Sequence, residues 1–306
     1  MRKVFLFIIL ILLFVFVFIY REDYSLKNSV LTGAVSNTES FVLDHGNISV
    51  YFCPREDCEG ALLAFLDTAQ ESIHCAMFEL SLKSLQDKIL EKSEVMDVKI
   101  VVDNQYLRRF NHSFVKIDSY GLMHNKFCIV DGKKISSGSM NPTNNCAHKN
   151  NNNLILIDSK VLAENYEQEF KEMWNGTFKK GSKVLNAKVN LDGVLIDNYF
   201  CPDDHCSYRV VEELKLAKDS IYFMTFSFTD ERIANMILLK NLENLSIKGV
   251  MEARQVSKYS VYNILNNSDI DLFKDGNKNN MHHIIYLSKD YCPKLGMLHH
   301  KVFIID

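Results

Sequence analysis

The sequence has no excess of basic residues, because 35 lysines and arginines face 38 aspartates and glutamates and the formal net charge is −3. Overall charge therefore gives no sign of a nucleic-acid-binding surface, although a local basic groove is compatible with it. Cysteine is also sparse, with eight in 306 residues, which excludes a small scaffold held together by disulfides. Because 47% of the residues are hydrophobic, we predict a globular protein with one large core or two ordinary ones.

Residues 4–20 form an unbroken apolar run. As a helix, the run would span roughly 25 Å, close to the thickness of the hydrocarbon region of a bilayer. A cleaved signal peptide and an uncleaved anchor are both possible, and the lack of a small-x-small cleavage site favours the anchor. Two basic residues precede the run, and one basic and two acidic residues follow it. We therefore predict a single-pass membrane protein with its body on the extracytoplasmic side, joined to the anchor by a stalk at 21–41.

Six of the cysteines allow local interpretations. Two segments, YFCPREDC and YFCPDDHC, each hold a cysteine pair: Cys53 and Cys58, and Cys201 and Cys206. Each pair could close as a disulfide, or the two pairs together could bind one zinc ion as four thiolates. We favour disulfides, because the predicted anchor places the body on an oxidising side and the four-residue gap is loose for zinc. Cys75 and Cys128 lie inside apolar runs and are interpreted as small buried hydrophobic residues.

The YFCP segment reveals an internal duplication. It occurs at 51–54 and again at 199–202, an offset of 148. Further along, GLMHNKFCIVD at 121–131 matches GMLHHKVFIID at 296–306, an offset of 175. The second copy therefore carries an insertion, which we place in its FKDGNKNNMHH region.

The two copies are assigned to residues 42–178 and 193–306, with a linker at 179–192. Strand-like runs alternate with helical patterns in each copy, which predicts an α/β fold with a mixed sheet flanked by helices. The predicted strands are 49–53, 72–80 and 98–103 in the first copy and 198–201, 220–228 and 246–252 in the second. The predicted helices are 59–70, 82–92 and 159–175 in the first copy and 210–218 and 232–242 in the second.

The segment HNKFCIVD carries polar residues in a pattern that suggests a phosphate site. If it forms a strand, His124 and Lys126 point to the same side, and two cationic groups held together suit an anion. Asp131 at the strand end is placed to fix an imidazole tautomer. The following GSMN segment offers a tight turn at Gly138 and polar donors for phosphate oxygens, namely Ser139 and Asn141.

The same array recurs as His299, Lys301 and Asp306. With this recurrence, the sequence resembles the phospholipase D superfamily, whose signature H-x-K-x4-D-x6-G-S-x-N is used twice. Residues 124–141 match every specified position of the signature, and residues 299–306 match its first half. The resemblance extends from about residue 48 onward.

The resemblance implies a phosphodiesterase that acts in two steps through a phosphohistidine. It assigns His124 as the nucleophile and His299 as the general acid and base. The remaining motif residues are expected to stabilise charge on the phosphate oxygens or to orient the imidazoles: Lys126, Lys301, Ser139 and Asn141 in the first role, and Asp131 and Asp306 in the second. No metal or other cofactor is implied, because the lysines supply the positive charge.

The second motif lacks its G-S-x-N half, so we predict that the second repeat is incomplete. Three functions follow. A membrane-anchored hydrolase of phospholipid headgroups is favoured narrowly; the alternatives are an endonuclease of the same superfamily acting on DNA or RNA, and an inactive binding protein. No obligate protein partner is evident.

Other candidate groups receive a structural interpretation. His282 and His283 are adjacent and are assigned to a solvated loop rather than to a metal site. The aromatic residues of YFMTFSF, at 222–228, are assigned to the core rather than to base stacking. The sequence does not place the basic residues at 107–109 and 133–134 relative to the site.

Overall fold

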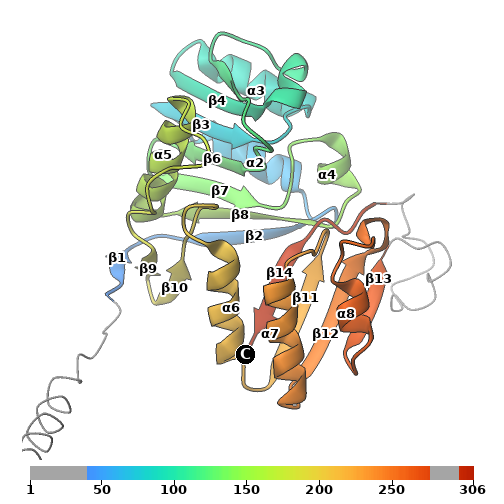
Figure 1. Ribbon diagram of the computed structural model, residues 1–306. Helices are drawn as coiled ribbons and strands as arrows, with labels where there is room; N and C mark the ends of the chain where they lie inside the picture. The colour runs from blue at the N-terminus through green and yellow to red at the C-terminus, as the bar shows by residue number, and fades with distance from the viewer. Residues whose placement is uncertain (1–39, 276–295) are drawn as a thin grey trace, which may run out of the picture. The chain divides into compact units, whose positions relative to one another are not determined.

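The computed structural model describes residues 40–275 and 296–306 (Figure 1). The predicted anchor at 4–20, nearly all of the predicted stalk and the His282–His283 loop lie outside the described residues. Within the described part of the chain, no helix is long and apolar enough to cross a membrane. Residues 42–306 form one compact unit, and its α/β character with helices flanking mixed sheets confirms the predicted fold class.

The first repeat is built on a seven-stranded mixed sheet in the order β2-β8-β7-β6-β3-β4-β5. β3, β4 and β5 pair in parallel, and the other neighbours are antiparallel. The strands in sheet order are β2 Ile48–Cys53, β8 Asn152–Asp158, β7 Lys134–Gly138, β6 Lys126–Val130, β3 Ser72–Met77, β4 Asp97–Asp103 and β5 Val115–Asp118.

Helices cover both faces of this sheet. On one face, Leu62 and Leu85 of the helices α2 and α3 are buried against strand residues such as Ile100. On the other face, Leu162 and Phe170 of α5 belong to a second core. The helical segments of the first repeat are α2 Cys58–Asp67, α3 Lys83–Ser93, the 3-10 helix η1 Asn104–Arg109, α4 Asn144–His148 and α5 Lys160–Trp174.

The second repeat contains a four-stranded sheet in the order β13-β12-β11-β14. This order and its strand directions reproduce β5-β4-β3-β6 of the first sheet, so the duplication seen in the sequence is also present in the fold. Among the described residues, the second sheet has no counterparts of β7, β8 and α5. The elements are β11 Ser220–Thr225, β12 Ser246–Glu252, β13 Asp271–Asp275, β14 Lys301–Ile305, α6 Cys206–Leu216, α7 Glu231–Leu242, η2 Ala253–Gln255 and α8 Tyr262–Asn266.

A small third sheet joins the two repeats. Its order is β1-β9-β10, with β1 Val42–Asp44, β9 Lys188–Leu191 and β10 Val194–Asp197. Part of the predicted linker is therefore a strand, β9. The predicted strand at 198–201 does not form, because Phe200 instead packs its ring against Tyr166 of α5, with centroids 4.9 Å apart.

The structure contains three disulfides among its described residues. Cys53 is joined to Cys58, and Cys201 to Cys206, the pairing favoured over zinc from the sequence. The third bond joins Cys75 to Cys128, and the interpretation of these two residues as unpaired hydrophobes was wrong. The sequence shows that both lie in apolar strands, but only the register places them directly opposite each other on β3 and β6.

Candidate active site

The two histidine motifs occupy equivalent positions, just before β6 and β14. In each repeat a phenylalanine follows the central strand and faces the motif. The ring of Phe78 lies 4.8 Å from that of His124, and the ring of Phe226 lies 4.8 Å from that of His299. The ammonium groups of the motif lysines lie 5.4 Å and 5.3 Å from the centres of the same two phenylalanine rings. Each motif therefore places an imidazole and a cation against one aromatic ring.

A backbone hydrogen bond fixes each lysine beside its histidine. Lys126 Nζ donates to the carbonyl of His124 at 2.7 Å, and Lys301 Nζ donates to the carbonyl of His299 at 2.8 Å. Each lysine is thus tied to the backbone of the residue whose side chain it accompanies. The two remaining protons of each ammonium group are available to an anion.

Two buried carboxylates that the motif search missed hold the chain just before each histidine. Asp103 accepts from the backbone N–H of Met123 at 3.0 Å, and Glu252 accepts from that of Leu298 at 2.9 Å. Both acids have no exposed surface. They end the equivalent strands β4 and β12, so an acidic residue recurring at this point of the repeat was the signal that could have revealed them.

The second motif docks directly on the first repeat. The N–H of Asn151 donates to the carbonyl of Met297, and the N–H of His299 donates to the carbonyl of Asn151, both at 2.9 Å. Gly296 is needed at the start of this contact, because a Cβ there would lie 1.7 Å from the carbonyl oxygen of Lys149. The docking brings together motifs that are 175 residues apart.

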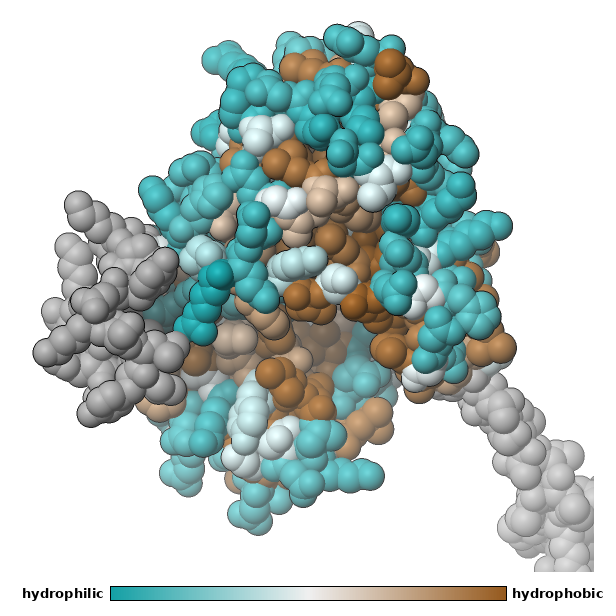
Figure 2. All heavy atoms as spheres, turned by 180° about the vertical axis from the view of Figure 1, so that it is seen from behind, coloured by the Kyte–Doolittle hydropathy of each residue, from teal (hydrophilic) through white to brown (hydrophobic). Residues whose placement is uncertain are grey.

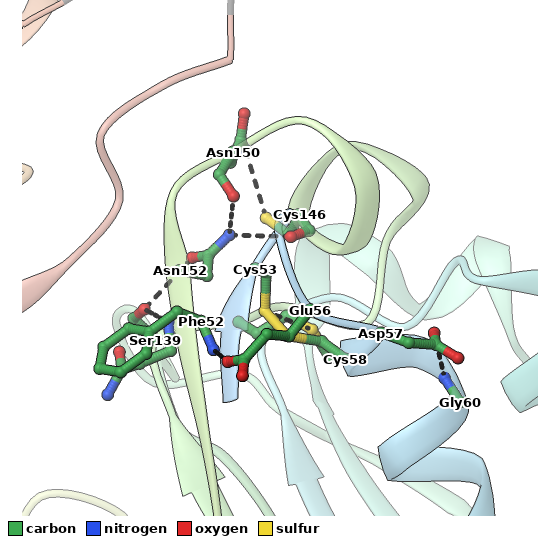
Figure 3. The surroundings of a disulfide bond; sticks show 12 residues. Phe52, Cys53, Glu56, Asp57, Cys58, Gly60, Ser139, Cys146, Asn150 and Asn152 are labelled. Carbon is green, nitrogen blue, oxygen red and sulfur yellow. Dashed lines mark hydrogen bonds between the residues drawn. A yellow bond between two sulfur atoms is a disulfide. The ribbon is translucent and has the colours of Figure 1, made fainter. Parts of the chain in front are cut away.

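Residues of the first repeat also fix the imidazole of His299. Its Nδ1 lies 3.0 Å from the carbonyl oxygen of Ser139 and 2.7 Å from Oδ1 of Asn152. The amide of Asn152 donates in turn to the carbonyls of Cys146 and Asn150 (Figure 3), so its oxygen must face the histidine. Both neighbours of Nδ1 are therefore acceptors. Nδ1 carries the proton, and Nε2 of the buried His299 keeps a lone pair.

His124 is in a different environment. It is exposed, whereas His299 has 5% of its surface exposed. Within the described residues its imidazole has the aromatic contact with Phe78 but no hydrogen-bond partner. In the described part of the chain, the imidazole of the first motif therefore has fewer contacts than that of the second.

Burial and the positive charges of the two lysines lower the pKa values of both histidines. Desolvation, with Lys126 and Lys301, lowers the pKa of His124 to about 4, and desolvation, with the same lysines, lowers that of His299 to about 3. Desolvation lowers the pKa of Lys126 to about 7, with a further contribution from Lys301, and lowers that of Lys301 to about 8. At neutral pH both imidazoles are neutral, and a bound anion would favour the protonated form of all four groups.

The motif aspartates do not orient the imidazoles, and that prediction was wrong. Asp131 accepts hydrogen bonds from the backbone N–H groups of residues 70–72, and Asp306 accepts from those of residues 219 and 220. The reason is strand length, because at about 3.3 Å per residue Asp131 lies roughly 20 Å from His124 along the chain. Each aspartate instead anchors the start of the neighbouring central strand.

The segment at 138–141, which follows the first motif, supplies both support for His299 and a buried polar side chain to the site. The hydroxyl of Ser139 donates to Asn152 at 3.2 Å and accepts from the N–H of Asn153 at 3.0 Å, so it supports the residue that holds His299. Asn141 is buried, and its Oδ1 has no partner among the described residues. Gly138 adopts a φ of 132°, and a Cβ there would lie 2.4 Å from the carbonyl oxygen of Asn153.

The basic residues that the sequence left unplaced are now located. Lys133 lies in the turn after β6 and Lys134 begins β7, so both lie near the end of β6 that is far from His124. η1 lies beside the site, since its Tyr106 contacts Phe78 at 4.9 Å, but its Arg109 forms an ion pair with Glu79. In the described part of the chain, no cluster of three or more potential metal ligands is present.

This geometry agrees with the similarity to known proteins. Residues 62–174 match the family model described as cardiolipin synthase, PLD-like domain. A phospholipase D of Rickettsia prowazekii is 32% identical over 140 residues, which cover 42% of this chain and 68% of that protein. The chain belongs to the phospholipase D superfamily. At the level of the family, the named relatives are hydrolases of the phosphodiesterase type.

A mitochondrial cardiolipin hydrolase of Xenopus tropicalis is 32% identical over 136 residues, which cover 40% of this chain and 65% of that protein. The chain therefore spans about two thirds of the length of these curated relatives. Among solved structures, a phosphatidylserine synthase of Haemophilus influenzae matches with a TM-score of 0.50 at 9% identity, covering 68% of this chain and 63% of that one. At this identity, the likeness concerns the fold alone.

Proposed function

We propose that this chain hydrolyses a phospholipid headgroup diester at a membrane surface, through a phosphohistidine intermediate. The observation that carries the proposal is the docking of the second motif on the first repeat, where the backbone of Asn151 bonds to that of His299 and the His299 imidazole lies against Ser139 and Asn152. Two imidazoles and two cations around one point form a site for a phosphodiester that supplies both a nucleophile and a proton donor.

The hydrogen bonds of His299 support a reversal of the roles expected from the family. Because its Nδ1 carries the proton, the lone pair of Nε2 attacks phosphorus, and the bond from phosphorus to the leaving oxygen breaks. His124, exposed and able to exchange protons with water, donates a proton to that oxygen once the bound phosphate has raised its pKa. Water then attacks phosphorus while His124 takes its proton, and the bond from phosphorus to Nε2 breaks.

The lysines stabilise the charge on the two non-bridging oxygens. Their ammonium groups are already oriented by backbone carbonyls, so little reorganisation accompanies the reaction. Asn141 lies in the segment between Ser139 and the helix α4, its amide oxygen has no partner in the described part of the chain, and it is assigned to substrate positioning. No metal ion is needed for this part of the chemistry.

Three observations support a lipid rather than a nucleic acid as substrate. The apolar run at 4–20 is long enough to anchor the chain in a bilayer. Lys133 and Lys134 lie at the far end of β6, and Arg109 is paired with an acid, so these residues do not form a basic stripe through the site. The two curated relatives described above are a phospholipase D and a cardiolipin hydrolase.

Single-turnover trapping with an aryl phosphodiester tests the assigned roles. Nitrophenolate leaves without protonation, so His124→Ala is expected to form the covalent phosphoenzyme and to release it slowly. His299→Ala is expected to form none. Quenching in an alkaline denaturant, which preserves the acid-labile P–N bond, and mass spectrometry of the full-length chain locate the phosphoryl group. A phosphoenzyme in His299→Ala would reverse the assignment, and its absence from both variants and the wild type would contradict the mechanism.

The substrate class is tested by parallel assays of cardiolipin vesicles, phosphatidylcholine vesicles and single-stranded DNA, with EDTA present. Cleavage of a lipid that disappears in His299→Ala is the expected result. Cleavage of DNA alone would favour the nuclease alternative. Binding without cleavage of any substrate would favour the inactive alternative.

A further inference from the structure

The 3-10 helix η1 is fixed beside His124 by one buried carboxylate. Oδ1 of Asp103 accepts from the N–H of Gln105 in η1 at 3.0 Å. Oδ2 of the same side chain accepts from the N–H of Met123, the residue before His124, also at 3.0 Å. Because both bonds end on one side chain, η1 and the first motif hold a fixed position relative to each other.

The second repeat contains the same arrangement. Glu252 accepts from the N–H of Arg254 in η2 through Oε1 and from the N–H of Leu298 through Oε2, at 3.3 Å and 2.9 Å. The side chain of Arg254 is 44% exposed, although β7, β8 and α5 of the first repeat are all in place. The side chain of Arg109 in η1 is similarly exposed, at 53%. The exposure of this turn is therefore a property of the repeat itself.

A row of aromatic rings leads from His124 to a guanidinium group of η1. The ring of Phe78 lies 4.8 Å from that of His124 and 4.9 Å from that of Tyr106. Cζ of Arg109 lies 5.3 Å from the centre of the Tyr106 ring. The row begins at the histidine that, in the mechanism proposed above, donates a proton to the leaving oxygen. The leaving alcohol is therefore expected to lie on the side of the site where η1 is found.

The surface of η1 carries more positive than negative charge. Arg108 and Arg109 are both exposed, and the ion pair of Arg109 with Glu79 uses Nη1. Asp103 is buried beneath the turn, and its oxygens already accept backbone N–H groups. A guanidinium group has further N–H donors, arranged in a fork that matches a carboxylate or a phosphate. Two arginines are too few for the basic stripe of a nucleic-acid interface, but they suffice for one anionic group.

The hollow between the two sheets offers no comparable partner for a charge. Seen from behind, the surface is hollowed there, and hydrophobic residues gather in the hollow (Figure 2). A charged group gains nothing from such a lining, because it would lose its hydration without a compensating hydrogen bond. On the His124 side of the described site, η1 is therefore the element that can bind a charge on the leaving alcohol.

We infer that η1 forms a subsite for the leaving group, in which Arg109, over the ring of Tyr106, binds an anionic group of the leaving alcohol. A quaternary ammonium group at the same place is repelled by the two arginines. The inference rests on the proposed function, including the role of His124 as proton donor, and extends it to the class of headgroup. An alcohol that carries a phosphate is preferred, a neutral polyol comes next and choline is the poorest leaving group.

The test uses the full-length chain and dihexanoyl phospholipids below their micelle concentrations. The three substrates share one diacylglycerol and release choline, glycerol or glycerol phosphate. The charge of the leaving alcohol therefore changes while the same type of bond is broken. In the wild type, kcat/KM is expected to rise at least about tenfold from the choline to the glycerol phosphate substrate.

Four variants show whether η1 causes this rise. Arg109→Met is expected to remove most of it, and Arg109→Lys to keep part, because lysine retains the charge but not the fork. Glu79→Gln removes the competing carboxylate and should increase the rise about twofold or more. Arg232→Met is the matched control, because Arg232 is also exposed and paired with an acid, Asp230, but lies on α7 of the second repeat.

A rise that is absent from the wild type, or unchanged in Arg109→Met, would overturn the inference, while turnover of bis(p-nitrophenyl) phosphate left the proposed function standing. If no diester is turned over, equilibrium binding of the three lipids is expected to follow the same order and to lose it in Arg109→Met. Binding that does not depend on headgroup charge would overturn the subsite. So would a loss of single-stranded DNA cleavage in Arg109→Met with the lipid reactions unchanged, because η1 would then serve a nucleic acid.

Discussion

The two histidines differ in what surrounds them, although their motifs are equivalent. His299, from the second repeat, is buried and fixed by Ser139 and Asn152 of the first repeat. His124, from the first repeat, is exposed and has no such support within the described residues. Each repeat supplies a histidine and a lysine, and residues next to β7 and β8, which follow the first motif, support the histidine of the second motif. Among the described residues, the two halves of the site are therefore chemically alike but differ in the contacts that hold their histidines.

The largest effect is expected from removing the support of His299. Asn152→Leu removes one of the two acceptors that fix Nδ1, and we expect kcat to fall on the order of 100-fold, because Nε2 no longer points reliably at phosphorus. Asn152→Asp restores an acceptor with a negative charge. It should recover part of the rate and move the acid limb of the pH profile to higher pH, since the carboxylate favours the imidazolium.

Steady-state kinetics with an aryl diester across the pH range distinguish a loss of His299 orientation from general damage to the fold. A purely structural role for Asn152 predicts equal losses in both variants and no change in the pH profile. Asn153→Leu provides the control at the next position. Asn153 contacts Ser139 through its backbone rather than its side chain, so this substitution should leave the site intact.

The second effect concerns the lysine pair. Because the pKa values of Lys126 and Lys301 are about 7 and about 8, their charge is lost as the pH rises through this range. With an aryl diester, which needs no proton donor, kcat/KM of the wild type should be level from about pH 5 to 7 and fall about tenfold or more by pH 9. A level profile up to pH 10 would show that the two lysines do not supply the charge.

A third expectation is that the site lowers the stability of the fold. Burial lowers the pKa of Lys126 from 10.5 to about 7, so its cation costs folding free energy that is fully present below pH 7 and disappears as the pH approaches 10.5. Lys126→Met should therefore abolish turnover and raise Tm by several degrees at pH 6, with a smaller gain at pH 10. Lys134→Met, on the neighbouring strand, is the control. A lower Tm for Lys126→Met at pH 6 would contradict this account.

The smallest effect on catalysis is expected at the motif aspartate. Burial opposes the ionisation of Asp131, but hydrogen bonds from three backbone N–H groups outweigh it and lower its pKa. Asp131→Asn should lower Tm by a few degrees at pH 7 and leave kcat of the folded enzyme within about twofold. The difference in Tm should vanish as the pH falls below the pKa of Asp131. The control Asp87→Asn, on the exposed face of α3, should change neither Tm nor kcat. A large loss of kcat in Asp131→Asn would show that Asp131 does orient the imidazole of His124.

The sequence predicted the features that depend on local pattern. Alternating strands and helices, the duplication and the residues of the two motifs were all visible as spacing. What it could not supply was register and long-range docking. The Cys75–Cys128 bond depends on how β6 aligns with β3, and the contact of Asn152 with His299 joins residues 147 apart. The role given to Asp131 failed because nearness in sequence was taken for nearness in space, although an intervening strand separates the two ends.

The central claim is that His124 and His299 of one chain act on one phosphorus atom. The most direct measurement is turnover of bis(p-nitrophenyl) phosphate, with EDTA present, by the wild type, by His124→Ala, by His299→Ala and by an equimolar mixture of the two variants. The account predicts EDTA-resistant turnover by the wild type, severe loss in each variant and no recovery in the mixture. Recovery in the mixture would show that the site forms between chains, and full activity in either variant would show that this is not the active site.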